Sequence, residues 1–126
     1  MKTFVRGLLF AAALAVGANG LMAGTTQASN ATLSQSIKQT KALEARAESP
    51  ADHRTLAADY RRLAQRQLEE SNKWADVTAW YARFPIYSSD KFRRSTIDHS
   101  QYYAEKYRQD AQKSERLANQ HERLAG

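Results

Sequence analysis

The chain has 126 residues, a net charge of +6 and no cysteine. This length allows one domain at most, and the lack of cysteine excludes both a disulfide framework and a catalytic thiol. No Gly-x-Ser-x-Gly, His-Glu-x-x-His or phosphate-binding loop occurs, so we expect a protein that is not an enzyme and that carries no organic cofactor.

Residues 1–28 have the pattern of a signal peptide. Lys2 and Arg6 precede an apolar run over residues 7–18, which is too short for a good membrane span. Thr26-Gln27-Ala28 then provides small residues at the positions that cleavage requires. We predict cleavage near Ala28; the alternatives are cleavage after residue 18 or 23, or a retained N-terminal anchor.

The mature chain is predicted to be a single domain, residues 29–126, in the periplasm or outside the cell. Loss of two basic residues with the signal peptide lowers its net charge from +6 to +4. This mild positive charge suits loose attraction to lipid headgroups or cell-wall polymers, although a solvated helix surface would have the same composition. An exported chain of such modest charge is not expected to bind nucleic acid.

The mature sequence predicts an all-α fold, because helix-forming residues dominate and two prolines divide the chain. We expect helices at about residues 33–48, 50–83 and 90–124. Ser49-Pro50-Ala51-Asp52 is a strong start signal for the second helix, and Phe84-Pro85 ends it. Thr32 with Gln35 and Ser95 with Asp98 also match capping boxes, so the third helix could begin anywhere from residue 89 to 95.

The two long helices carry heptad patterns that complement each other in an antiparallel hairpin. In one register, bulky residues of the second helix face small residues of the third at several layers, and a stripe of small residues lies beside them. The expected pairs are His53 with His121, Tyr60 with Ser114, Gln67 with Tyr107, Trp74 with Ser100, Ala57 with Ala118, Ala64 with Ala111, and Ser71 with Ala104. Alternating large and small residues fill a core without voids.

Leucines flank this seam and widen the apolar stripe beyond that of a two-helix pair. They are Leu56, Leu63, Leu68, Leu117 and Leu124. The shorter first helix can cover the stripe, which would give a three-helix bundle. Self-association into a homo-oligomer is the other way to cover it.

The histidines provide a candidate metal site. His53 and His121 are expected in one layer, and two imidazoles could hold Zn²⁺ or Cu²⁺ with help from Asp52 or Glu122. His99 is roughly 33 Å along the helix from His121 and cannot join them. A hydrogen-bonded or pH-sensitive histidine pair is the simpler alternative.

The predicted turn combines aromatic and basic residues, which suits a membrane interface or a partner groove. The candidate interaction surface comprises Trp80, Phe84, Tyr87, Phe92, Arg93 and Arg94. We expect Trp80 to point partly outward and Trp74 to be buried against Ser100. An aromatic mini-core that merely closes the turn would use the same residues.

Several of these motifs together resemble a group of small secreted bacterial α-helical proteins of uncharacterised function. The similarity covers about residues 41–125 and includes Ser49-Pro50-Ala51-Asp52-His53, Asp98-His99 and Leu117-Ala118 with His121. The resemblance implies an exported helical hairpin and no particular activity. Members often carry a His-Cys pair where this chain has His99-Ser100, which argues against a thiol role here.

From these features we expect a non-enzymatic exported envelope protein that binds a partner helix or an anionic membrane or cell-wall surface. The alternative is a periplasmic protein that binds Zn²⁺ or Cu²⁺ through His53 and His121.

Overall fold

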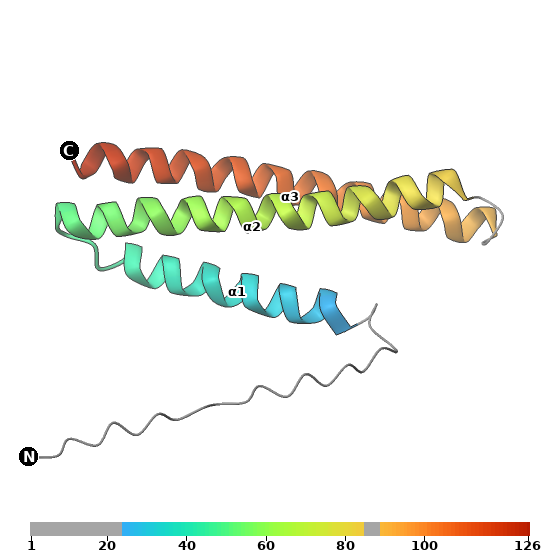
Figure 1. The fold of residues 1–126 in the computed structure, drawn as a ribbon, viewed down its shortest axis with the longest axis horizontal. Coiled ribbons are helices and arrows are strands. Elements are labelled where there is room, and N and C mark those ends of the chain that lie inside the picture. The colour runs from blue at the N-terminus through green and yellow to red at the C-terminus, as the bar shows by residue number, and fades with distance from the viewer. Residues whose placement is uncertain (1–23, 85–88) are drawn as a thin grey trace, which may run out of the picture.

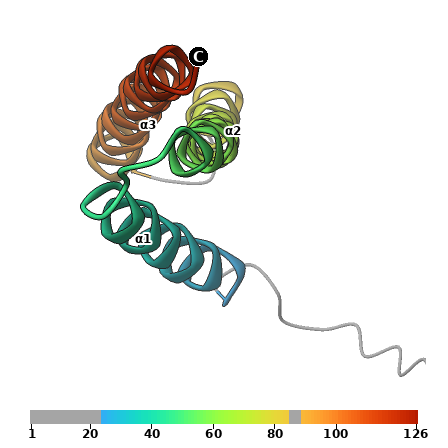
Figure 2. The ribbon, with the colours of Figure 1, turned by 90° about the vertical axis from the view of Figure 1, so that its left-hand side faces the viewer.

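The computed structural model describes residues 24–84 and 89–126, and the elements in these ranges are α-helices. They are α1 (Gly24–Glu44), α2 (Pro50–Arg83) and α3 (Asp90–Leu124). Helices α2 and α3 pack along each other as a long antiparallel hairpin, and the shorter α1 crosses obliquely beside α2 (Figures 1 and 2). We call the end where α1 and α3 finish and α2 begins the open end. The predicted signal peptide lies mostly outside the described residues.

The start of α2 is held by the capping box that the sequence predicts. The Ser49 hydroxyl accepts a hydrogen bond from the Asp52 backbone N–H, and the Asp52 carboxylate accepts one from the Ser49 N–H. The Ser49 N–H, the Ser49 hydroxyl and the Glu48 N–H all donate to the Asp52 carboxylate. They hold its pKa below its usual value, since they favour the charged form. Pro50 occupies the first turn, where a missing N–H costs nothing.

Two other capping boxes that the sequence suggests do not form at a helix start, although α3 begins at Asp90, as predicted. Helix α1 runs through Thr32, whose carbonyl accepts a hydrogen bond from Ser36 inside the helix, and α1 ends at Glu44 instead of residue 48. Likewise, Ser95 lies inside α3, which is capped by Ser89. A capping pattern acts only where a helix begins, and both helices begin further upstream, at Gly24 and at Asp90.

The small-residue seam between α2 and α3 has the predicted register. Ala57 and Ala118 are 3% and 0% exposed, and Ala64 and Ala111 are buried beside them. Ser71 donates a hydrogen bond to the Ala104 carbonyl at 2.7 Å, so these two residues pair as predicted. Small side chains at these positions allow the two backbones to approach closely.

The long side chains of the seam depart from the predicted pairs. Gln67 accepts a hydrogen bond from Ser114 instead of facing Tyr107, and Tyr60 stacks on His121 instead of facing Ser114. Helical side chains lean toward the N-terminus of their own helix. Long residues of α2 therefore reach α3 residues nearer the open end than the backbone register alone predicts.

Trp74 is another correction, because it is half-buried and not fully buried as predicted. Its ring stacks on Tyr103 and meets the edge of His99. Ser100 is fully buried and shares a 2.7 Å hydrogen bond with Thr78. The hydroxyl is tolerated in this buried layer because it has a polar partner there.

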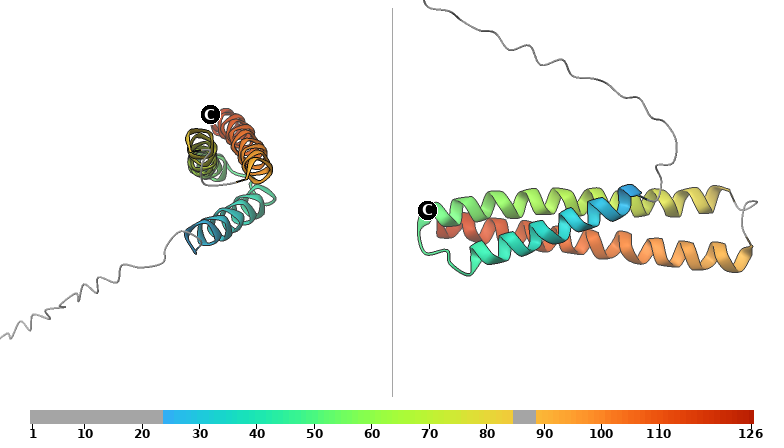
Figure 3. Two further views of the ribbon diagram at one scale, coloured as in Figure 1. Left: turned by 90° about the vertical axis from the view of Figure 1, so that its right-hand side faces the viewer. Right: turned by 90° about the horizontal axis from the view of Figure 1, so that it is seen from below.

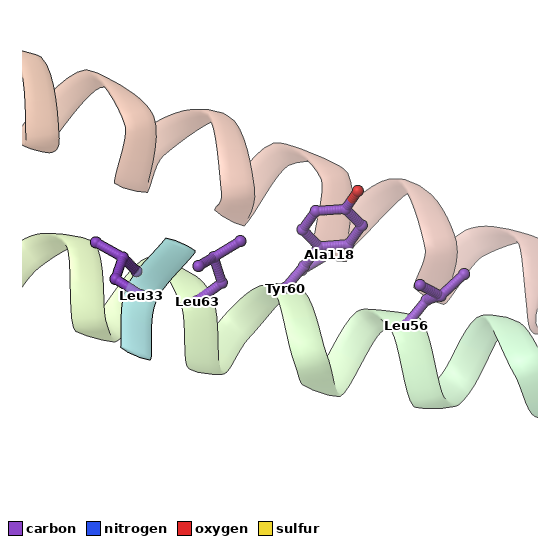
Figure 4. Close-up of a cluster of buried hydrophobic side chains, with 5 residues drawn as sticks. All are labelled: Leu33, Leu56, Tyr60, Leu63 and Ala118. Carbon is purple, nitrogen blue, oxygen red and sulfur yellow. The ribbon is translucent and has the colours of Figure 1, made fainter. Parts of the chain in front are cut away.

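A compact core forms where α1 lies on the hairpin. Figure 4 shows its buried members Leu33, Leu56, Tyr60, Leu63 and Ala118. Ile37, Leu43 and Leu117 pack against them. Helix α1 thus covers much of the leucine stripe, as predicted, but Leu68 and Leu124 remain about half exposed.

Beyond α1, the hairpin continues as two helices with no third helix over them among the described residues (Figure 3). No described helix has an apolar stretch long enough to cross a membrane.

Candidate functional site: the histidine pair and the hairpin tip

His53 and His121 meet at the open end, as the seam predicts. Their Nδ1 atoms are 3.1 Å apart, while the ring centroids are 5.2 Å apart with planes 21° from parallel. Because the nitrogens are much closer than the centroids, the rings meet through their Nδ1 edges. His121 is 5% exposed, and His53 is half-buried, so solvent reaches the pair from the α2 side.

Helix α1 adds a carboxylate to this pair. Glu44 Oε1 is 3.3 Å from Nε2 of His121, and Oε2 accepts a 2.7 Å hydrogen bond from the Tyr60 hydroxyl. The Tyr60 and His121 rings stack within 5° of parallel. Burial, reinforced by the bond to the Glu44 carboxylate, raises the pKa of Tyr60 well above its usual value. The network connects all three helices at one end of the molecule.

These contacts determine which nitrogens carry hydrogen. A carboxylate can only accept, so His121 Nε2 donates to Glu44. In neutral His121, Nδ1 is then the acceptor, and His53 Nδ1 must donate to it. Nε2 of His53 has no contact in this network.

The pair also has the spacing of two metal ligands. Two imidazole nitrogens bound to one Zn²⁺ at ~2.0–2.1 Å in tetrahedral geometry lie about 3.4 Å apart, close to the observed 3.1 Å. A carboxylate on the far nitrogen of one histidine is the usual outer-shell partner of a metal-binding imidazole. Glu44 takes this position relative to His121. In this arrangement His53 would bind through Nδ1 and lose the N–H that now bonds His121.

Neither of the predicted helper carboxylates completes a protein ligand set. Asp52 is engaged by Ser49, and Glu122 pairs with Arg61. Across residues 24–84 and 89–126, no group of three or more His, Asp or Glu side chains is placed to hold a metal. The remaining coordination positions would belong to solvent. His99 packs against Trp74 and Tyr103, apart from the pair, as predicted.

The second candidate site is the hairpin tip, defined here as Trp80, Phe84, Phe92, Arg93 and Arg94. The three rings are 48%, 37% and 57% exposed, which confirms the prediction that Trp80 points partly outward. The rings also touch: Trp80 contacts Tyr81 and Phe84, and Tyr81 contacts Phe92. The aromatic rings of the tip therefore pack against one another and are also exposed to solvent.

The cations of the tip differ in their burial. Arg94 is exposed, whereas Arg93 is half-buried with its Nε away from solvent. Tyr87, the remaining predicted member of the surface, lies outside the described residues.

Sequence reasoning missed Glu44 and Tyr60 as partners of the histidines. Tyr60 was placed in the seam but one layer away from its actual contact. The sequence predicts a first helix that continues to residue 48, whereas α1 ends at Glu44. Nothing in the spacing of Glu44 indicates that it reaches His121. Glu44 reaches His121 and Tyr60 only because of the position that α1 takes on the hairpin. The heptad patterns of α2 and α3 do not predict this position.

Comparison with known proteins found no matching family model, no similar curated protein and no similar solved structure. Function is therefore inferred from the chain's own geometry.

Proposed function

We propose that this is an exported, non-enzymatic protein that attaches to an anionic membrane surface through the hairpin tip. The observation that carries the proposal is the exposure of Trp80, Phe84 and Phe92 at the end of the hairpin that α1 does not cover. The signal-peptide pattern of residues 1–28 supports the export part of the proposal.

The chemistry of the tip suits a lipid headgroup region. Exposed tryptophan and phenylalanine beside cations are typical of side chains that enter the membrane interface. Between residues 83 and 94 the chain has four cations, Arg83, Lys91, Arg93 and Arg94, against one carboxylate, Asp90. The tip is therefore locally positive, although the whole chain is only mildly basic. We favour a lipid surface over a partner helix because the rings gather at one end and do not form a stripe along a groove.

The test uses the mature protein with Trp74→Phe, which leaves Trp80 as its only tryptophan. Vesicles that contain phosphatidylglycerol should shift its emission to the blue as the indole leaves water. High salt should weaken this binding, because exposed charges are screened beyond ~8–10 Å at physiological ionic strength. Arg93→Glu with Arg94→Glu should abolish the shift.

Arg61 and Arg62 provide the matched control, since they are also adjacent arginines but lie on α2 toward the open end. Their reversal to Glu should leave the Trp80 shift in place. The proposal is wrong if vesicles leave the Trp80 emission unchanged, or if both arginine pairs affect binding equally. Saturable binding to a purified protein without any vesicle shift would indicate a protein partner instead.

The Nδ1–Nδ1 spacing of His53 and His121 favours a second candidate function, the binding of Zn²⁺ or Cu²⁺. Either metal should raise the melting temperature of the mature protein through linkage. His53→Ala and His121→Ala should remove this effect, whereas His99→Ala should retain it. Glu44→Gln should weaken binding by about 10–100-fold, as expected for an outer-shell partner. Calorimetry without binding heat for either metal would exclude this function.

A further inference from the structure

A pocket of about 420 Å³ lies between the three helices, on the side of the core between α1 and α3. This volume falls within the range of about 300–1,000 Å³ that small-molecule sites occupy. Its apolar lining comes from every helix: Ile37 of α1, Tyr60 and Leu63 of α2, and Leu117 of α3. Figure 4 shows Tyr60 and Leu63 projecting from α2 on the same side.

Two lysines and two carboxylates line this pocket, and they differ in their partners. Its two carboxylates already have partners: Glu44 accepts from Tyr60 and faces His121, and Asp110 accepts from Lys106 at 2.7 Å. The two lysines that line it, Lys41 on α1 and Lys113 on α3, have no carboxylate partner among the described residues. Two ammonium groups on opposite helices are therefore available to an anion.

A largely buried glutamine also lines the pocket. Gln67 is 5% exposed, and its Oε1 accepts a 2.7 Å hydrogen bond from the Ser114 hydroxyl. Its amide N–H groups find no acceptor within the described part of the chain. The amide nitrogen is not sealed from solvent, so its N–H groups are free to donate to a molecule in the pocket.

We propose that the pocket binds a single-chain anionic amphiphile, such as a long-chain fatty carboxylate. The hydrocarbon chain would lie on the apolar lining, and the carboxylate would sit between Lys41 and Lys113 or accept from Gln67. Helix α1 packs mainly on α2. A ligand held by lysines of α1 and α3 would therefore also tie α1 to α3. The site is remote from the hairpin tip and does not depend on the proposed membrane attachment.

Titration calorimetry of the mature protein with dodecanoate, below its micelle concentration, tests this site. We expect saturable binding of one molecule per chain, with little or no binding of hexanoate or of the uncharged dodecyl maltoside. Lys41→Gln and Lys113→Gln should each weaken binding by about tenfold, as for loss of one charge-assisted contact. Lys38→Gln is the matched control, because Lys38 is an exposed lysine of the same helix that does not line the pocket.

Two outcomes would overturn the proposal. One is the absence of saturable binding heat with dodecanoate. The other is equal weakening by Lys38→Gln, which would mean nonspecific attraction to a basic surface. Arg93→Glu with Arg94→Glu separates this site from the proposed function: dodecanoate binding should persist in that variant even where vesicle binding is lost.

Discussion

At the scale of single residues, Tyr60 is the best-defined member of the open-end network. It is 4% exposed, it stacks on His121, and its hydroxyl donates to Glu44. The bond to a carboxylate is favourable only while the phenol is protonated. Stability should therefore depend on the ionisation of this one side chain at alkaline pH.

Tyr60→Phe should lower the free energy of unfolding by about 1 kcal/mol at pH 7, from loss of one hydrogen bond to a partly exposed partner. Because folding raises the pKa of Tyr60, its contribution is fully present below the unfolded value near 10 and declines as the pH rises above it. The Tyr60→Phe variant lacks this decline, so the difference in the free energy of unfolding between parent and variant should shrink between pH 10 and 11. Urea unfolding of both proteins at each pH measures this difference.

Tyr102→Phe is the control for this experiment, since Tyr102 is 63% exposed. It should change stability little at any pH. A Tyr60→Phe variant as stable as the parent at pH 7 would mean that the Tyr60–Glu44 bond contributes nothing to folding.

At the scale of helices, the close approach of α2 and α3 rests on alanine at successive layers of the seam. Ala57 and its neighbour Ala58 provide a direct comparison. Ala57 is 3% exposed and lies on the seam, whereas Ala58 is exposed one position further along the same helix. The same substitution at either position changes helix propensity equally. A difference in stability between the two variants therefore reports on packing alone.

Ala57→Leu should destabilise the protein by roughly 1–3 kcal/mol, because extra carbon atoms in a close helix contact force the backbones apart. Ala58→Leu should change stability by less than about 0.5 kcal/mol, as is usual for surface positions. Thermal and urea unfolding of both variants measure the effect. Equal melting of the two would show that the seam has room for a larger residue.

At the scale of the whole molecule, α1 is a smaller unit docked on an extended hairpin. The hairpin is held along its length by the seam, while α1 is held chiefly by Leu33 and the residues packed around it. The bundle therefore consists of two parts with different stability. Local opening of α1 should require less free energy than separation of α2 from α3.

Leu33→Ala should weaken the docking of α1 by about 2–3 kcal/mol through loss of a buried leucine. Hydrogen exchange should then become faster across α1 and remain slow along the α2–α3 seam. Leu68→Ala, at a half-exposed leucine, is the control and should leave exchange in α1 unchanged. Faster exchange throughout α2 and α3 in the Leu33 variant would mean that the three helices unfold as one unit.

The sequence by itself determined the helical class, the boundaries of α2 and α3 and the hairpin register. Helix propensity, the Ser49–Pro50 start and the stripe of small residues on both long helices are local or pairwise signals, and they agree with one another. The same register brought His53 and His121 together correctly. Capping motifs were less reliable, because Thr32 and Ser95 have suitable neighbours but lie inside longer helices.

Only the tertiary structure decided how α1 lies on the hairpin and what it brings there. Helix α1 has a weak apolar pattern, so many orientations are compatible with its sequence, and packing against Leu56, Tyr60 and Leu63 selects one. That choice places Glu44 against His121 and opens the pocket between α1 and α3. These contacts join residues of α1 and α3 that are more than 60 positions apart in the sequence. Their proximity depends on how all three helices pack together, and the heptad pattern of two helices does not specify this packing.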